Sequence, residues 1–176
     1  DNTLLNQYTI FKVLLETGDR NDVADMVLMT PTAMKLIKED DRDKNYLVKE
    51  NKGYTAYYYD HKMMGKTEKG NHTFSPELVK VIRRFIKVKN IKTTDSIFTN
   101  SANTSYTRNQ ISQILGNGSK KYIGKNVGSR VIRHLVITQE KAPFKELEKE
   151  LNEKKEAIAK KHGHSVLTMD LIYDDN

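Results

Sequence analysis

Apolar positions at the start of the chain recur at the spacing of one helix face. They are Leu4, Leu5, Tyr8, Phe11, Leu14 and Leu15. With Asn2 and Thr3 available as caps, this pattern predicts an amphipathic helix over residues 3–16 that ends near Gly18. The same reasoning predicts a short second helix over residues 22–28. Thr30 and Pro31 then supply a cap and a first-turn proline for a third helical stretch through Ile37.

Between residues 40 and 75 the pattern changes to short β segments. A charged loop over residues 40–44 precedes two candidate strands, 46–48 and 55–59, which a turn at Asn51, Lys52 and Gly53 joins. A third candidate strand, around residues 72–74, follows a loop over residues 65–71. These segments predict one small antiparallel sheet of three strands.

The remainder of the chain has helical periodicity. Ser75 and Pro76 open a helix to about residue 88, and Thr107 caps another that runs through residue 115. A loop over residues 116–125 precedes a largely buried helix over 127–139. Residues 143–161 predict a solvated helix with one narrow apolar seam, and a last helix begins near residue 165. The sum is an α+β fold that is mostly helical with one small sheet.

Composition indicates the kind of partner. At 176 residues the chain is long enough for one compact core, so we predict a single domain over residues 1–176. Its net charge of +7 favours a polyanionic partner, nucleic acid first. Of the 30 basic residues only seven are arginine, which makes each arginine a candidate for a specific role.

The absence of cysteine excludes disulfides, thiolate nucleophiles and cysteine-ligated zinc, and fits a reducing intracellular compartment. The apolar runs are too short to span a bilayer, and nothing in the given sequence resembles a signal peptide. The chain starts in helix-like sequence and stops three residues after Tyr173. We therefore expect an excised domain of a longer protein.

Three local patterns combine basic and phenolic side chains. The first, Leu-Leu-Glu-Thr-Gly-Asp-Arg, ends at Arg20 just past a glycine that can end a helix. The second, Ser-Arg-Val-Ile-Arg-His, contains Arg130 and Arg133. The third, His-Gly-His-Ser, contains His164 and precedes Tyr173 by nine positions. In a basic chain, these residue types favour a phenolic nucleophile directed at a phosphate.

In this order the three patterns resemble the catalytic domain of the tyrosine recombinases, the phage-type integrase family. Members of that family carry a Thr-Gly-x-Arg turn, a His-x-Leu-Arg-His helix, a Leu-Gly-His turn and a tyrosine nine residues later. The resemblance covers nearly the whole chain, including a small sheet between the first and second arginine. It implies the fold of the DNA breaking-rejoining enzymes.

The resemblance implies a role for each residue. Arg20 and Arg133 would clamp the non-bridging oxygens of a pentacoordinate transition state. The planar guanidinium fork is better suited to this role than the ammonium group of lysine. Tyr173 would attack the phosphorus, forming a 3′-phosphotyrosine and releasing a 5′-hydroxyl. His164 would hydrogen-bond a phosphate oxygen. A phenol has an ordinary pKa of about 10, so Tyr173 would need activation by the local positive field or a nearby acceptor.

In this family a lysine on the hairpin between the second and third strands protonates the leaving 5′ oxygen. Lys66 is our candidate because a Lys-Thr pair about nine residues before Ser75 and Pro76 is similar to the family's hairpin. Lys62 and Lys69 are the alternatives. Since one ester is exchanged for another, the reaction would need neither ATP nor a metal, and no cofactor is expected.

Two positions depart from the family pattern. Arg130 stands where the family has histidine, or lysine in the related type IB topoisomerases. Arginine can stabilise charge but cannot act as a general base at neutral pH. Val23 stands where an acidic residue usually follows the first arginine, which leaves Asp22 or Asp25 to orient Arg20.

Simpler interpretations apply to several of these residues. Taken alone, Arg20 could simply end a helix. His134 is expected to be structural, and a metal between His162 and His164 has little support without cysteine and with few acids nearby. The tyrosines at 57–59 are expected to pack a strand. The charged run over 145–161 is expected to be a solvated face.

The leading hypothesis is a site-specific DNA recombinase or integrase domain, from a virus or mobile element. A type IB topoisomerase or a telomere resolvase would use the same residues, and a non-catalytic DNA-binding descendant is the alternative from another class. The partner would be duplex DNA, completed by an N-terminal DNA-binding domain absent from this chain. The full-length protein would act as a tetramer on DNA and the isolated domain as a monomer, intracellular wherever the DNA is.

Overall fold

The computed structural model describes residues 2–38, 43–59, 70–163 and 165. The chain packs as two compact units, residues 1–136 and 137–176, and each is described by itself. The expectation of one catalytic domain over the whole chain stays a prediction. None of the described helices combines the length and the apolarity needed to cross a membrane.

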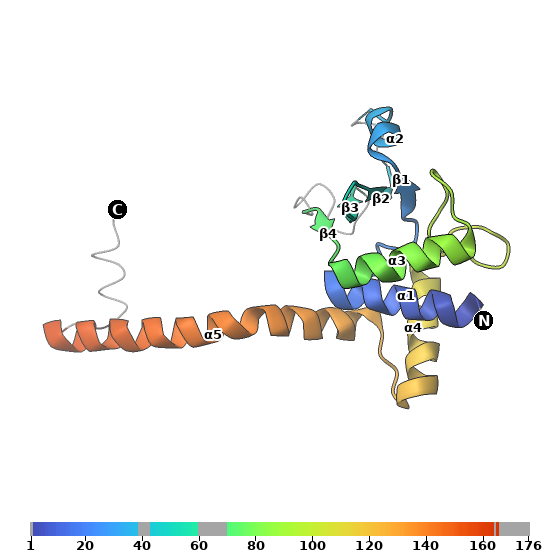
Figure 1. The fold of residues 1–176 in the computed structure, drawn as a ribbon. Coiled ribbons are helices and arrows are strands. Elements are labelled where there is room, and N and C mark those ends of the chain that lie inside the picture. The colour runs from blue at the N-terminus through green and yellow to red at the C-terminus, as the bar shows by residue number, and fades with distance from the viewer. Residues whose placement is uncertain (1, 39–42, 60–69, 164, 166–176) are drawn as a thin grey trace. The chain divides into compact units, whose positions relative to one another are not determined.

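The first unit is an α+β structure (Figure 1). Its helices are α1 (Asn2–Thr17), α2 (Pro31–Lys35), α3 (Pro76–Lys89) and α4 (Arg108–Ile123), followed by the first turns of α5 (Ser129–His162). Its strands are β1 (Val27–Met29), β2 (Asn45–Lys49), β3 (Tyr54–Tyr58) and β4 (His72–Thr73). The mostly helical α+β prediction is therefore confirmed at the level of fold class.

The sheet has four strands in the order β1-β2-β3-β4, so the prediction of three antiparallel strands is wrong. β2, β3 and β4 pair antiparallel as expected, and β1 is added parallel to β2, with Val27 opposite Tyr46. The predicted helix over 22–28 is also wrong, because residues 27–29 form this strand. All three of its residues are buried, so pairing and burial decide their conformation.

Side-chain alternation along β2 divides the interior into two clusters. Leu47 faces the main core, whereas Tyr46 and Val48 face a smaller cluster with Met34 of α2. The main core lies among α1, α3, α4 and the sheet, and α1 and α3 run side by side (Figure 1). Its largest fully buried side chains include Ile10, Leu14, Leu78, Ile82, Phe85, Phe98, Ile111 and Leu115.

Helix starts follow the capping signals of the sequence. The hydroxyls of Thr30, Ser75 and Thr107 each accept a hydrogen bond from a backbone N–H of the helix that follows. Two later boundaries differ from prediction. α4 continues to Ile123 through the residues predicted as a loop, and α5 continues through Pro143 where two helices were predicted.

In the second unit, the described residues are mainly those of helix α5. α5 extends through it to His162, and Phe144, Leu147, Leu151 and Ile158 are all at least half exposed. Charged residues occupy most of the positions between them, and Lys149 and Glu153 form an ion pair one turn apart at 3.8 Å. This agrees with the expected solvated face that carries a narrow apolar seam.

Candidate functional site

The turn after α1 is the centre of the candidate site. Gly18 has a φ of +61°, the left-handed conformation that commonly ends a helix, and its N–H donates to the Leu14 carbonyl at 3.0 Å. The turn then delivers Arg20, whose side chain is exposed. This matches the predicted arginine just past a helix-ending glycine.

Arg133 reaches the same turn from the start of α5. Its Nη1 donates to the Gly18 carbonyl at 3.2 Å, across a sequence separation of 115 residues. Ile132 and Val136 are buried, which fixes this helix face on the core. A Cβ on Gly18 would lie 3.0 Å from Val136 Cγ1, so α5 approaches the turn closely. The structure thus brings the Thr-Gly-x-Arg turn and the second arginine motif together.

The rest of the second arginine motif is more exposed than predicted. Arg130 and His134 are exposed, and Arg133 is partly buried. Val131 and Leu135 are also exposed, so the prediction of a largely buried helix over 127–139 is wrong. Arg130 lies one turn before Arg133, on the same side of the helix. No contact within the described part of the chain assigns a partner to Arg130.

The residues after Arg20 are fixed to α4 and to the core. Asn21 donates from Nδ2 to the Arg108 carbonyl at 2.8 Å and to Ser112 Oγ at 2.6 Å. The buried Asp22 carboxylate lies 3.7 Å from the Arg108 Nε. Val23, at the position where the family has an acid, is completely buried in the core. The expectation that Asp22 or Asp25 orients Arg20 stays a prediction.

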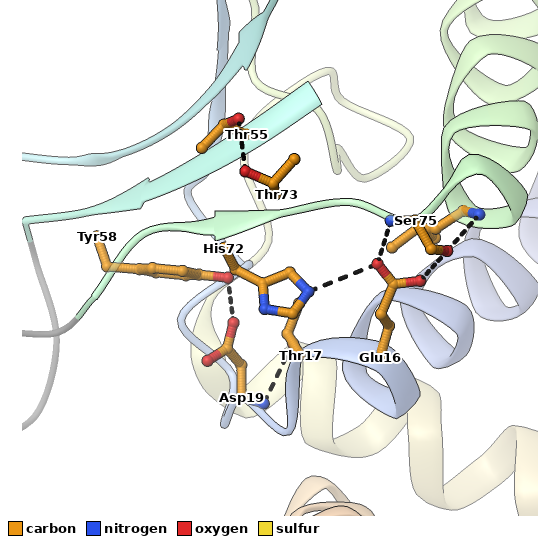
Figure 2. A network of polar contacts seen from close by, with 9 residues as sticks. Glu16, Thr17, Asp19, Thr55, Tyr58, His72, Thr73 and Ser75 are labelled. Atoms are coloured by element: carbon orange, nitrogen blue, oxygen red, sulfur yellow. Dashed lines mark hydrogen bonds and ion pairs between the residues drawn. The ribbon is translucent and has the colours of Figure 1, made fainter. Parts of the chain in front are cut away.

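A polar network that sequence reasoning missed lies next to this turn (Figure 2). The Glu16 carboxylate accepts hydrogen bonds from the Ser75 N–H at 2.7 Å and the Ser75 hydroxyl at 2.5 Å. His72 Nε2 lies 3.5 Å from the same carboxylate. Glu16 lies in the last turn of α1, His72 belongs to β4 and Ser75 caps α3, so the network joins three elements.

A second contact in Figure 2 holds the turn from β3. The Tyr58 hydroxyl donates to the Asp19 carboxylate, and the Asp19 N–H donates to Thr17 Oγ1 at 3.2 Å. Burial, followed by the negative charge of Asp19, raises the pKa of Tyr58 far above its ordinary value. Tyr58 therefore remains a neutral hydrogen-bond donor at physiological pH.

Other predicted site residues lie outside the described residues. They are Lys62, Lys66, Lys69, His164 and Tyr173, so their roles stay predictions. Tyr57 and Tyr58 lie in β3, and Tyr59 packs edge-on against Tyr46 at 5.9 Å between ring centroids. This agrees with the expectation that residues 57–59 pack a strand.

Comparisons of the chain with protein-family models, with curated proteins and with solved structures find no match. Two arginine motifs that are far apart in the sequence meet at one turn. Contacts of this turn and its flanking residues anchor it to α3, α4 and the sheet.

Proposed function

We propose that this chain is the catalytic domain of a site-specific DNA recombinase or integrase, with the fold of the DNA breaking-rejoining enzymes. The supporting observation is the hydrogen bond from Arg133 to the Gly18 carbonyl, two residues before Arg20. Two guanidinium-bearing segments that meet at one turn suit a phosphate better than any neutral substrate. The net charge of +7 favours duplex DNA as the source of that phosphate.

The proposed reaction exchanges one phosphate ester for another. The Tyr173 oxygen forms a bond to phosphorus, the bond from phosphorus to the 5′ oxygen breaks, and the phenol proton passes to solvent water. Lys66 gives a proton to the departing 5′ oxygen, which becomes a hydroxyl. Arg20, Arg133 and His164 hold the phosphate oxygens, where negative charge builds up in the transition state. Arg130 adds positive charge at neutral pH without accepting a proton.

Covalent trapping tests this proposal. The protein is incubated with a labelled pool of nicked duplexes of randomised sequence, in which cleavage releases a short strand and prevents rejoining. EDTA is present and ATP is omitted. We expect a detergent-resistant adduct from the unmodified protein and none from Tyr173→Phe. Tyr122→Phe, which removes a hydroxyl from an exposed tyrosine of α4, is the matched control and should react normally.

Two results would contradict the proposal. An adduct that persists in Tyr173→Phe would mean that another residue is the nucleophile. Failure of the unmodified protein to form any adduct, while it still binds duplex DNA with a steep dependence on salt, would favour the non-catalytic descendant. The recovered strands would also identify the sequences that the protein cleaves.

A further inference from the structure

The turn that carries Arg20 follows the last turn of α1, where the Glu16 carboxylate joins α1 to β4 and to the start of α3. This carboxylate receives the Ser75 N–H and the Ser75 hydroxyl and lies beside His72 Nε2. These groups come from residues 56 and 59 positions away in the sequence. Figure 2 shows that they approach one carboxylate from β4 and from the start of α3.

Ser75 has two roles in this arrangement. Its hydroxyl oxygen accepts from the Leu78 N–H at 3.2 Å and so caps α3, while its proton is donated to Glu16. The end of α1 is thereby tied to the beginning of α3. Two residues after Glu16, the Gly18 carbonyl accepts a hydrogen bond from Arg133. The next residue, Asp19, accepts one from the Tyr58 hydroxyl of β3. The backbone from residue 16 to residue 19 is thus fixed on both sides of the left-handed Gly18.

We infer that Glu16 is a positioning residue, which acts through the turn to set the place of the Arg20 guanidinium relative to Arg133. This inference rests on the proposed function. A left-handed glycine is a flexible joint unless its flanks are held, because glycine populates many backbone conformations. Small displacements of a phosphate-binding arginine reduce a rate steeply, since transition-state contacts depend on geometry. Glu16 holds the flank on the α1 side.

A purely structural role for the network would be to fasten α1 to α3. Two substitutions separate the roles. Glu16→Gln keeps the size of the side chain, but it removes the charge and replaces one acceptor oxygen by a donor. Ser75→Asp keeps a good helix cap, and its charge suits the start of a helix, but it places a second carboxylate against Glu16. The control is Glu77→Gln, which removes an exposed charge from the first turn of α3.

Amide hydrogen exchange reports directly on the turn. The Gly18 and Asp19 N–H groups are both hydrogen-bonded, to the Leu14 carbonyl and to Thr17 Oγ1. We expect their exchange to become roughly tenfold faster in Glu16→Gln and in Ser75→Asp, because hydrogen bonds to an ionised group are among the stronger ones. Exchange in Glu77→Gln should equal that of the unmodified protein.

Single-turnover cleavage of a suicide duplex reports on the positioning of Arg20. We expect a rate roughly ten- to a hundredfold lower in Glu16→Gln, with the Kd for the duplex within about twofold. The reason is that binding is spread over many phosphates, whereas the transition state depends on the clamp. Glu16→Asp, which restores the charge with a shorter reach, should recover part of the rate. All rates are measured where circular dichroism shows each variant to be folded.

The outcomes are distinct. Unchanged exchange in both variants overturns the inference, because the network would then not hold the turn. Faster amide exchange with an unchanged cleavage rate also overturns the inference. Glu16 would then have only a structural role, in which it connects α1 to α3. If the unmodified protein forms no adduct at all, the proposed function itself fails and the positioning role fails with it.

Discussion

Gly18→Ala is the substitution for which the structure gives the sharpest expectation. Gly18 has a φ of +61°, which an alanine adopts at a cost of roughly 1–2 kcal/mol. The new Cβ would also lie 3.0 Å from Val136 Cγ1 and 3.5 Å from Val136 Cβ. Because Val136 belongs to the buried face of α5, it cannot simply rotate into solvent.

The two penalties can be separated in magnitude. Forcing a methyl group into a packed site costs about 1–3 kcal/mol. Added to the backbone cost, this gives a loss of roughly 2–5 kcal/mol in the free energy of unfolding for Gly18→Ala. Gly124 provides the matched control, since its φ is +75° and a Cβ there would meet nothing within 4 Å. Gly124→Ala should therefore lose only the backbone part, roughly 1–2 kcal/mol.

Urea unfolding followed by circular dichroism measures both losses. A third variant, Val136→Ala, completes a double-mutant cycle with Gly18→Ala. If the contact with Val136 is the cause, Val136→Ala will cost less in the Gly18→Ala background than in the unmodified protein. Equal losses for Gly18→Ala and Gly124→Ala, with additive behaviour in the cycle, would refute the reasoning. Gly18→Ala should also impair adduct formation, because the Gly18 carbonyl accepts the Arg133 hydrogen bond.

Two further predictions concern neighbouring contacts. Because the pKa of Tyr58 is raised, the folded state retains the phenol proton above pH 10, where the unfolded chain loses it. The stability that Tyr58 provides is therefore complete below pH 10 and falls as the pH rises further. Urea titrations at pH 9–11 measure the free energy of unfolding against pH. Tyr58→Phe should make its fall with pH less steep, by up to about 1.4 kcal/mol per pH unit. Equal slopes for Tyr58→Phe and the unmodified protein would contradict the expectation. Arg133→Lys keeps the charge but loses the planar fork, so suicide-duplex cleavage should fall roughly a hundredfold, whereas Arg84→Lys on exposed α3 should leave it unchanged.

Local chemistry explains which elements could be predicted from the sequence. Ser75 with Pro76, Thr30 with Pro31, and Thr107 each begin a helix because a side-chain oxygen accepts a backbone N–H that would otherwise lack a partner. These interactions span three residues, so the sequence contains all the information. The turn between β2 and β3 is also local, because the Glu50 N–H donates to the Gly53 carbonyl at 3.0 Å.

Elements decided by distant contacts could not be predicted. Three apolar residues at 27–29 fit a helix turn or a strand equally well, and pairing with β2 selects the strand. The glycines in α4 suggested a loop, but the helix continues through them. A Cβ on Gly116 would lie 2.7 Å from Asn126 Oδ1, so that position packs closely, whereas one on Gly118 would make an ordinary contact, 3.4 Å from Gln7 Cδ. Such contacts have no local signature.

Some residues of the candidate site could be proposed from the sequence, and others could not. The arginines could be proposed because arginine is scarce here and because Arg20 and Arg133 stand in recognisable patterns. Glu16 and His72 were missed because carboxylates and single histidines are common on surfaces. Their meeting depends on how the sheet packs beside the end of α1. Only a three-dimensional arrangement identifies which of the many acidic residues lies beside both Ser75 and His72.

The strand tyrosines bear on the choice of nucleophile. A phenol that attacks phosphorus must give up its proton, and burial raises the pKa of Tyr54, Tyr57 and Tyr58. The Tyr58 hydroxyl already donates to Asp19, and the Tyr57 hydroxyl donates to Glu50 at 3.4 Å, which further disfavours the phenolate. These three phenols are thus poorly suited to attack at neutral pH, although Tyr58 contacts the very turn that carries Arg20. Under the proposed function, these three strand phenols are therefore not candidates for the nucleophile, which is consistent with the proposal for Tyr173.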